Sequence, residues 1–170
     1  MTSHAAPKIP PPLVVLAALG AQRMMTDGRT GSVVAKGAAG ILAAASAGLA
    51  IWADVAFRAA RTTVDPMHPE RSTTLIVSGA YQASRNPIYL GMIGGVVAHG
   101  LWRGSMRALL PAVGVTLWLD RLQIPAEEEA LATLYGEAYE NYRESVPRWI
   151  QIPSSLIWAA SRDRKGIVEG

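Results

Sequence analysis

A polar cluster stands where an apolar segment begins. The stretch GAYQASRNPIYLG, residues 79–91, places Arg85, Asn86 and Pro87 between two tyrosines, Tyr81 and Tyr89. A guanidinium can bind a carboxylate through two parallel hydrogen bonds, and an aromatic face can bind a cation. A proline ends a helical hydrogen-bond ladder and leaves backbone groups free for a ligand. The spacing therefore indicates a binding site for a small charged molecule, next to a segment that resembles a membrane span.

A second polar cluster follows the last apolar segment, where Glu127, Glu128 and Glu129 stand together. Pro125 suits the first turn of a helix, and acids in that turn interact favourably with the helix dipole. We interpret Glu128 and Glu129 in this way, whereas Glu127 is a candidate acceptor of hydrogen bonds from an ammonium group. The predicted helix continues to Pro147, with apolar and aromatic residues at helical spacing at Leu131, Leu134, Tyr135, Tyr139 and Tyr142. Tyr139, Tyr142 and Trp149 are interpreted as packing residues.

Four apolar segments must position these clusters, at about residues 13–25, 33–57, 88–102 and 108–124. A full helical span needs about 20 apolar residues, and only the second segment meets that length comfortably. We predict one all-α domain over residues 1–170, a polytopic membrane helix bundle with about four spans. Its cofactor-binding head consists of the 58–87 connection, which contains Pro66 and Pro69, and the C-terminal helix. Three consecutive prolines from Pro10 argue against a cleavable signal peptide.

Small residues predict how the spans pack. Gly40, Ala44 and Gly48 recur every four residues, which would allow close helix approach along that face. Gly91 and Gly95 repeat this spacing in the third segment, and His99 continues the stripe. We interpret His99 as a hydrogen-bonded interior histidine and not as a ligand or base.

Composition and charge narrow the function. The chain has no cysteine, which excludes disulfides, thiol nucleophiles and thiolate metal sites. Its net charge of +3 comes from scattered cations, a pattern that fits an anionic membrane surface better than nucleic acid. With four spans, more cations lie on the side of the 58–87 connection, which the positive-inside rule places in the cytoplasm. We therefore expect an integral membrane protein of a bacterial inner membrane whose head faces the cytoplasm.

The two clusters together resemble the isoprenylcysteine carboxyl methyltransferase family and the related phospholipid N-methyltransferases. That pattern joins Gly-x-Tyr-x-x-x-Arg-(His or Asn)-Pro-x-Tyr-x-Gly to a later Glu-Glu-x-x-Leu-x-x-x-(aromatic)-Gly-x-x-Tyr-x-x-Tyr. The matching residues here are Gly79, Tyr81, Arg85, Asn86, Pro87, Tyr89 and Gly91, and then Glu127, Glu128, Leu131, Tyr135, Gly136, Tyr139 and Tyr142. The resemblance covers about half of the chain, from about residue 58 to residue 150.

The resemblance implies a methyltransferase that uses S-adenosylmethionine, with no metal, and a lipophilic small-molecule or lipid acceptor in the membrane. Arg85 would bind the cofactor's carboxylate and Glu127 its ammonium, which makes these two the predicted catalytic residues. The family's cofactor contacts carry over to Thr73, Thr74, Leu75, Ile76, Tyr81, Asn86, Pro87, Ile88, Tyr89 and Glu127. The polar cluster would then lie at the lipid boundary because one substrate is water-soluble and the other is membrane-borne.

One departure from the family bears on the acceptor. The carboxyl methyltransferases have an arginine four residues before the Glu pair, where this chain has Gln123, and Arg121 is out of register. Prenylcysteine is therefore a doubtful acceptor, and both carboxylate O-methylation and amine N-methylation stay open. An amine acceptor would need a base, for which His68 and His99 are candidates. The alternatives to an enzyme are a four-helix transporter, which would need an acid deep in a span such as Asp54 or Asp120, and a non-catalytic membrane scaffold.

Overall fold

The computed structural model describes residues 7, 9–26, 28, 30–59 and 74–150. Among the predicted features, Thr73, His68, the two prolines of the 58–87 connection and the tail after residue 150 lie outside the described residues. The part of the chain that is described folds into helices and contains no strand, as the sequence predicts. The principal helices are α1 (Pro11–Met24), α2 (Val33–Ala59), α3 (Pro87–Arg103), α4 (Leu110–Trp118), α5 (Ile124–Tyr135) and α6 (Glu137–Ser145). Short 3-10 turns occur at η2 (Gly79–Gln82) and η3 (Met106–Leu109).

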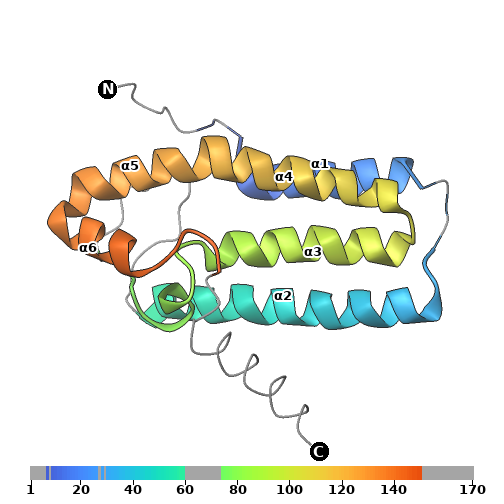
Figure 1. Cartoon of the computed structure of the whole chain (residues 1–170), viewed down its shortest axis with the longest axis horizontal. Helices are drawn as coiled ribbons and strands as arrows, with labels where there is room; N and C mark the ends of the chain where they lie inside the picture. Colours follow the sequence, from blue (N-terminus) through green and yellow to red (C-terminus); the bar gives the residue numbers. More distant parts are fainter. Residues whose placement is uncertain (1–6, 8, 27, 29, 60–73, 151–170) are drawn as a thin grey trace, which may run out of the picture.

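Helix α3 is the centre of the bundle. It packs along α2 on one side and against α1 and α4 on the other, and α1 and α4 also touch each other (Figure 1). One apolar core fills the space between α1, α3 and α4, with Val96, Val115 and Leu119 almost fully buried. This arrangement brings the start of α3, the end of α2 and helices α5 and α6 together at one end of the bundle.

Two glycines of α3 allow α2 to approach closely. A Cβ added at Gly91 would lie 2.8 Å from the carbonyl oxygen of Ser46, and one added at Gly94 would lie 2.2 Å from the Ser46 hydroxyl. Both distances are shorter than any ordinary contact, so α2 could not pack this near if either position carried a side chain. Gly91 was predicted to serve this purpose, whereas Gly95, its predicted partner, faces open space.

The predicted packing face of α2 is wrong. Gly40, Ala44 and Gly48 are exposed in this chain, and a Cβ at either glycine would meet nothing within 4 Å. The buried face instead carries Ala39, Ser46 and Ala53 at seven-residue intervals. Small residues occupy both faces of α2, so the four-residue spacing did not identify the face that meets α3.

Pro125 lies in the first turn of α5, as predicted, but α5 has no free start. Helix α4 runs into a π-helical turn, Leu119–Gln123, and then into α5 without a break, so that Pro125 lies inside a continuous helical run. A proline within a helix clashes with the carbonyl four residues before it. The π turn lies where that clash would occur, and the Ile124 amide donates to the Leu119 carbonyl five residues back. Glu127–Glu129 therefore have no free helix end beside them, contrary to the sequence interpretation.

The C-terminal helix is also broken, where a single helix was predicted. Gly136 has φ +52 and ψ −125, which ends α5 and turns α6 back beneath it (Figure 1). Helix α6 ends at Ser145, before Pro147, as predicted. The reversal places Tyr139 and Tyr142 against η2 and the end of α2, where both are buried and form an edge-on ring pair. Their interpretation as packing residues is confirmed.

One helix of the described chain is long and apolar enough to cross a membrane, namely α2 over Val33–Ala56. The other three predicted apolar segments are helical, but each falls short of that length and composition. The bundle as a whole presents many exposed large apolar side chains on α1, α2 and α4, among them Leu16, Ile41 and Val113.

Candidate functional site

Glu127 is held at the site end of the bundle by two neutral donors. The Tyr89 hydroxyl, from the first turn of α3, donates to Oε1 of Glu127. The Gln123 amide, from the π turn one helical turn earlier, donates to the same oxygen at 2.6 Å. No arginine or lysine of the described residues forms an ion pair with Glu127. The two donors leave Oε2 of Glu127 without a partner among the described residues, and this oxygen is not fully buried.

The Glu127 carboxylate is largely buried and has no positively charged partner among the described residues. Burial raises the pKa of Glu127 to about 7, and the nearby charge of Glu128 adds to the increase, while the hydrogen bonds from Gln123 and Tyr89 oppose it. A buried carboxylate is costly to ionise without a positive partner. Near neutral pH, Glu127 is therefore poised between its two protonation states, and an ammonium group next to Oε2 would favour the ionised one.

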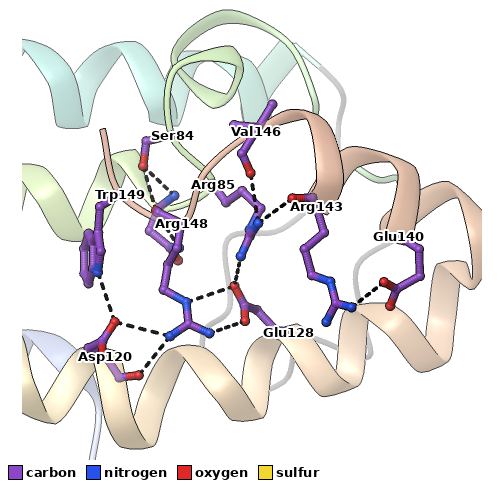
Figure 2. Close-up of polar contacts among 10 residues, drawn as sticks. Ser84, Arg85, Asp120, Glu128, Glu140, Arg143, Val146, Arg148 and Trp149 are labelled. Atoms are coloured by element: carbon purple, nitrogen blue, oxygen red, sulfur yellow. Dashed lines mark hydrogen bonds and ion pairs between the residues drawn. The ribbon is translucent and has the colours of Figure 1, made fainter. Parts of the chain in front are cut away.

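Glu128, one residue later, has the opposite environment (Figure 2). Its carboxylate pairs with Arg85 at 2.7 Å and with Arg148 at 2.5 Å, and its side chain is 13% exposed. The interpretation of Glu128 as a first-turn helix acid is wrong, because it is the centre of a two-arginine network. The neighbouring Glu129 is exposed.

Arg85 joins the two sequence clusters. One of its terminal nitrogens donates to Glu128, and the other donates to the carbonyls of Arg143 and Val146 at the end of α6. Its guanidinium thus already serves as a link between the 79–91 stretch, α5 and α6. Direct binding of a cofactor carboxylate by Arg85, which remains a prediction, would require some of these bonds to be exchanged.

The segment after α6 fastens this end of the molecule. The Arg148 guanidinium bridges Glu128 and Asp120. The backbone carbonyl of Arg148 accepts hydrogen bonds from Ser84 Oγ at 3.0 Å and Asn86 Nδ2 at 3.1 Å. The indole of Trp149 donates to the same Asp120 oxygen at 3.0 Å, and Figure 2 shows the whole chain of contacts. Trp149 therefore lies against the π turn between α4 and α5 and packs against the apolar core. The side-chain amide of Asn86 donates to the Arg148 carbonyl, and a contact of Asn86 with adenine stays a prediction.

The other predicted cofactor residues lie in one apolar cluster beside Glu127. Ile76 and Tyr81 are buried in it, and Leu75 and Ile88 pack against it. The Tyr142 hydroxyl donates to the Tyr81 carbonyl at 2.8 Å, which ties α6 to η2. Thr74 is exposed, and Pro87 is buried in the first turn of α3. The structure thus brings the described members of the predicted set to one end of the bundle.

The remaining sequence candidates do not belong to this site. His99 lies ten residues along α3 from Tyr89, about 15 Å away at the rise of an α-helix, and its Nδ1 is 2.7 Å from the Gln22 side-chain oxygen. His99 is hydrogen-bonded, as predicted, but it is only partly buried, and it cannot act as a base beside Glu127. Asp54 and Asp120, the candidate acids of a transporter, each pair with an arginine.

Comparison with known proteins identifies the family. The sequence profile described as "Phospholipid methyltransferase" matches residues 35–138, more than half of the chain. This chain belongs to the phospholipid methyltransferase family. An uncharacterized protein of Haemophilus influenzae is 32% identical over 63 residues, which make up 37% of this chain and 100% of that protein. No solved structure matches the chain. Family membership implies a membrane methyltransferase that acts on lipids.

The matched region of the phospholipid methyltransferase family contains Tyr89, Gln123 and Glu127, but it ends before the Arg148 segment. Sequence reasoning missed both the bond from Gln123 to Glu127 and the whole Arg148 network. The four-residue spacing of Gln123 and Glu127 is a signal that could have revealed the first, because such residues are neighbours on a helix. An arginine at position 123, as in the carboxyl methyltransferases, would stand against Glu127.

Proposed function

We propose that this member of the phospholipid methyltransferase family uses S-adenosylmethionine to methylate a lipophilic acceptor at the membrane. The observation that carries the proposal is the contrast between two adjacent carboxylates. Glu128 is neutralised by two arginines, whereas Glu127 is held only by neutral donors and keeps one oxygen without a partner among the described residues. A primary ammonium group has the charge and the donors that Glu127 lacks, and the proposed methyl donor carries one.

The residues of the site therefore fit this cofactor by their chemistry. Bound S-adenosylmethionine would supply a methyl group activated by a sulfonium centre. Glu127 would hold the ammonium through Oε2, with Tyr89 and Gln123 fixing the orientation of the carboxylate. Tyr81, Asn86, Pro87 and Ile88 would line the remainder of the site, together with Thr73, Thr74, Leu75 and Ile76. The contribution of the protein is mainly to position two reactants, which can account for a large part of the rate.

The acceptor we propose is a lipid, or another hydrophobic molecule, that reaches the site from the bilayer. The family profile supports this class, and the apolar exterior of α1, α2 and α4 supports residence in a membrane. Whether the methyl group goes to a carboxylate oxygen or to an amine is a finer question. For an amine, His99 lies too far along α3 to serve as the base, and Glu127 would already be paired with the ammonium of the cofactor.

We further propose that the bundle crosses the membrane about four times with the Glu127 end in the cytoplasm, where the soluble cofactor is available. The greater number of cations on that side supports this orientation. The chain has no cysteine, so single cysteines can be labelled without background. A cysteine at Ser105, in the turn between α3 and α4, should react with an impermeant thiol reagent outside intact cells, and one at Ser145 should not. The reverse pattern would place the site outside and contradict the proposal.

Binding of S-adenosylmethionine to the purified protein in detergent, measured by calorimetry, tests the function. We expect Glu127→Ala to weaken binding by about 1.5–3 kcal/mol, the scale of a hydrogen bond to a charged group. The matched control is Glu129→Ala, two residues away and exposed, which should leave binding unchanged. A wild type that binds no S-adenosylmethionine would favour a transporter. Binding without methyl transfer to any component of a membrane lipid extract would favour a scaffold.

A further inference from the structure

The opposite end of the bundle contains a buried cation without a counter-charge. Arg103, in the last turn of α3, is 9% exposed. Its Nε donates to the hydroxyl of Thr26 at 2.8 Å, and Thr26 in turn donates to the Gln22 carbonyl at 2.9 Å. No carboxylate of the described residues forms an ion pair with Arg103. Arg85, the comparably buried arginine at the other end, pairs with Glu128.

Hydrogen bonds link the elements that surround Arg103. The buried Gln22 amide donates to the carbonyls of Val96 at 2.9 Å and Ala108 at 2.5 Å, which joins α1 to α3 and η3. The Gly31 amide donates to the Trp102 carbonyl at 2.7 Å, which holds the connection before α2 against the end of α3. The guanidinium thus lies between elements that are tied to one another, and its one hydrogen bond to a described residue is the donation from Nε to Thr26.

The two stretches of sequence next to this end of the bundle are strongly basic. Residues 23–36 and 99–110 contain one acid, Asp27, against five cations, which are Arg23, Arg29, Lys36, Arg103 and Arg107. Lys36 lies 5.7 Å from the centre of the Trp102 ring, so its ammonium is beside the end of α3 that carries Arg103. Burial without an anion nearby disfavours a guanidinium because the group loses hydration that nothing replaces. An anion with several oxygens would remove this cost and could accept two hydrogen bonds from the planar fork of an arginine.

We propose that Arg103, with Lys36 and Arg107, binds the phosphate of a phospholipid headgroup at the end of the bundle opposite Glu127. The inference rests on the membrane residence proposed above but not on methyl transfer, because the site is separated from Glu127 by the length of α3. A headgroup phosphate lies at the depth where helices leave the apolar layer, which is where Arg103 ends α3. The bound lipid would hold the bundle together and would not be the molecule that is methylated.

The test is thermal unfolding of the delipidated protein in detergent, followed by tryptophan fluorescence. The additions are phosphatidylglycerol, phosphatidylcholine or inorganic phosphate. The variants are Arg103→Gln and, as a charge-matched control, Arg121→Gln, whose side chain is exposed on the π turn. We expect either phospholipid to raise the midpoint of the wild type and of Arg121→Gln, and to have less than half of that effect on Arg103→Gln. Without lipid, Arg103→Gln should be at least as stable as the wild type, because the substitution removes an uncompensated buried charge.

The order of the two unfolding midpoints, wild type against Arg103→Gln, should differ with and without lipid, and this change separates a lipid site from a structural arginine. If Arg103→Gln is destabilised equally with and without lipid, or if lipid stabilises it as much as the wild type, the proposal is overturned. Stabilisation by inorganic phosphate at the same concentration would assign the site to a free anion instead of a lipid. If Arg103→Gln does not fold, Lys36→Gln provides the second variant, and it should reduce the lipid-dependent shift because Lys36 belongs to the proposed site. Binding of S-adenosylmethionine should be the same in Arg103→Gln as in the wild type, whether or not the proposed function holds.

Discussion

Removing Arg148 should loosen the candidate site, and the structure allows the size of the effect to be worked out. The guanidinium contacts Glu128 through Nε at 3.2 Å and Nη2 at 2.5 Å, and it contacts Asp120 through Nη1 at 3.2 Å. Breaking a fully buried ion pair by removing one partner costs about 3–5 kcal/mol. Arg148 is 31% exposed, and Glu128 keeps Arg85 as a partner, so both facts reduce the figure. We expect Arg148→Ala to cost about 2–3 kcal/mol.

The chain provides a matched control for this prediction. Arg121 pairs with the same Asp120, at 3.1 Å, but its side chain is 77% exposed. Exposed pairs contribute about 0–1 kcal/mol, so Arg121→Ala should be close to neutral. For a chain of this size, the unfolding midpoint of Arg148→Ala should fall by roughly 4–12 °C, and that of Arg121→Ala by no more than about 4 °C.

The assay is tryptophan fluorescence of the purified proteins during heating in detergent, with Arg148→Lys as a third variant. A lysine keeps the charge but lacks the planar fork, so it should recover only part of the loss. Calorimetry provides the second reading. The Arg148 side chain holds in place the segment whose backbone carbonyl accepts from Ser84 and Asn86, so affinity for S-adenosylmethionine should fall in Arg148→Ala and not in Arg121→Ala. Equal midpoints for the two alanine variants would refute the reasoning that this network holds the site.

Two further predictions follow from the packing of α3 and from the electrostatics of Glu127. Gly91→Ala should destabilise the protein by about 1–3 kcal/mol, because its Cβ would meet the Ser46 carbonyl at 2.8 Å. Gly95→Ala, in open space, should be neutral or stabilising. Equal unfolding midpoints of the two variants would show that α2 and α3 do not pack this closely. Affinity for S-adenosylmethionine should rise with pH between about 5.5 and 7, by up to about tenfold per unit, because an ammonium binds the ionised form of Glu127, whose pKa in the free protein is about 7. The same binding should release a proton below pH 7, which calorimetry in buffers of different ionisation enthalpy would detect. Glu127→Gln should abolish both the pH dependence of the affinity and the proton release. An unchanged pH profile in that variant would assign the titration to another group.

The sequence predicted correctly what depends on local composition and spacing. Apolar runs indicated the helices α1 to α4, and Pro147 marked the end of α6, because these features follow from burial and from backbone chemistry that act within a few residues. The order and spacing of the two polar clusters, from Gly79 to Gly91 and from Glu127 to Tyr142, predicted the family that the comparison then identified. His99 was interpreted correctly as a hydrogen-bonded residue, although it is only partly buried.

Only the tertiary structure decided which polar residues meet. Glu127 and Glu128 are adjacent and chemically identical, yet one receives two neutral donors and the other two arginines. Helical geometry points neighbouring side chains about 100° apart, so the partners of each depend on what α3, α6 and the residues after α6 present to that side. The π turn before Pro125 and the reversal at Gly136 set those directions, and although a proline and a glycine mark the two positions, neither residue specifies the direction that the chain takes. The packing face of α2 was predicted incorrectly for the same reason: small residues line more than one side of the helix, and it is Gly91 and Gly94 on the partner helix that determine which side is buried.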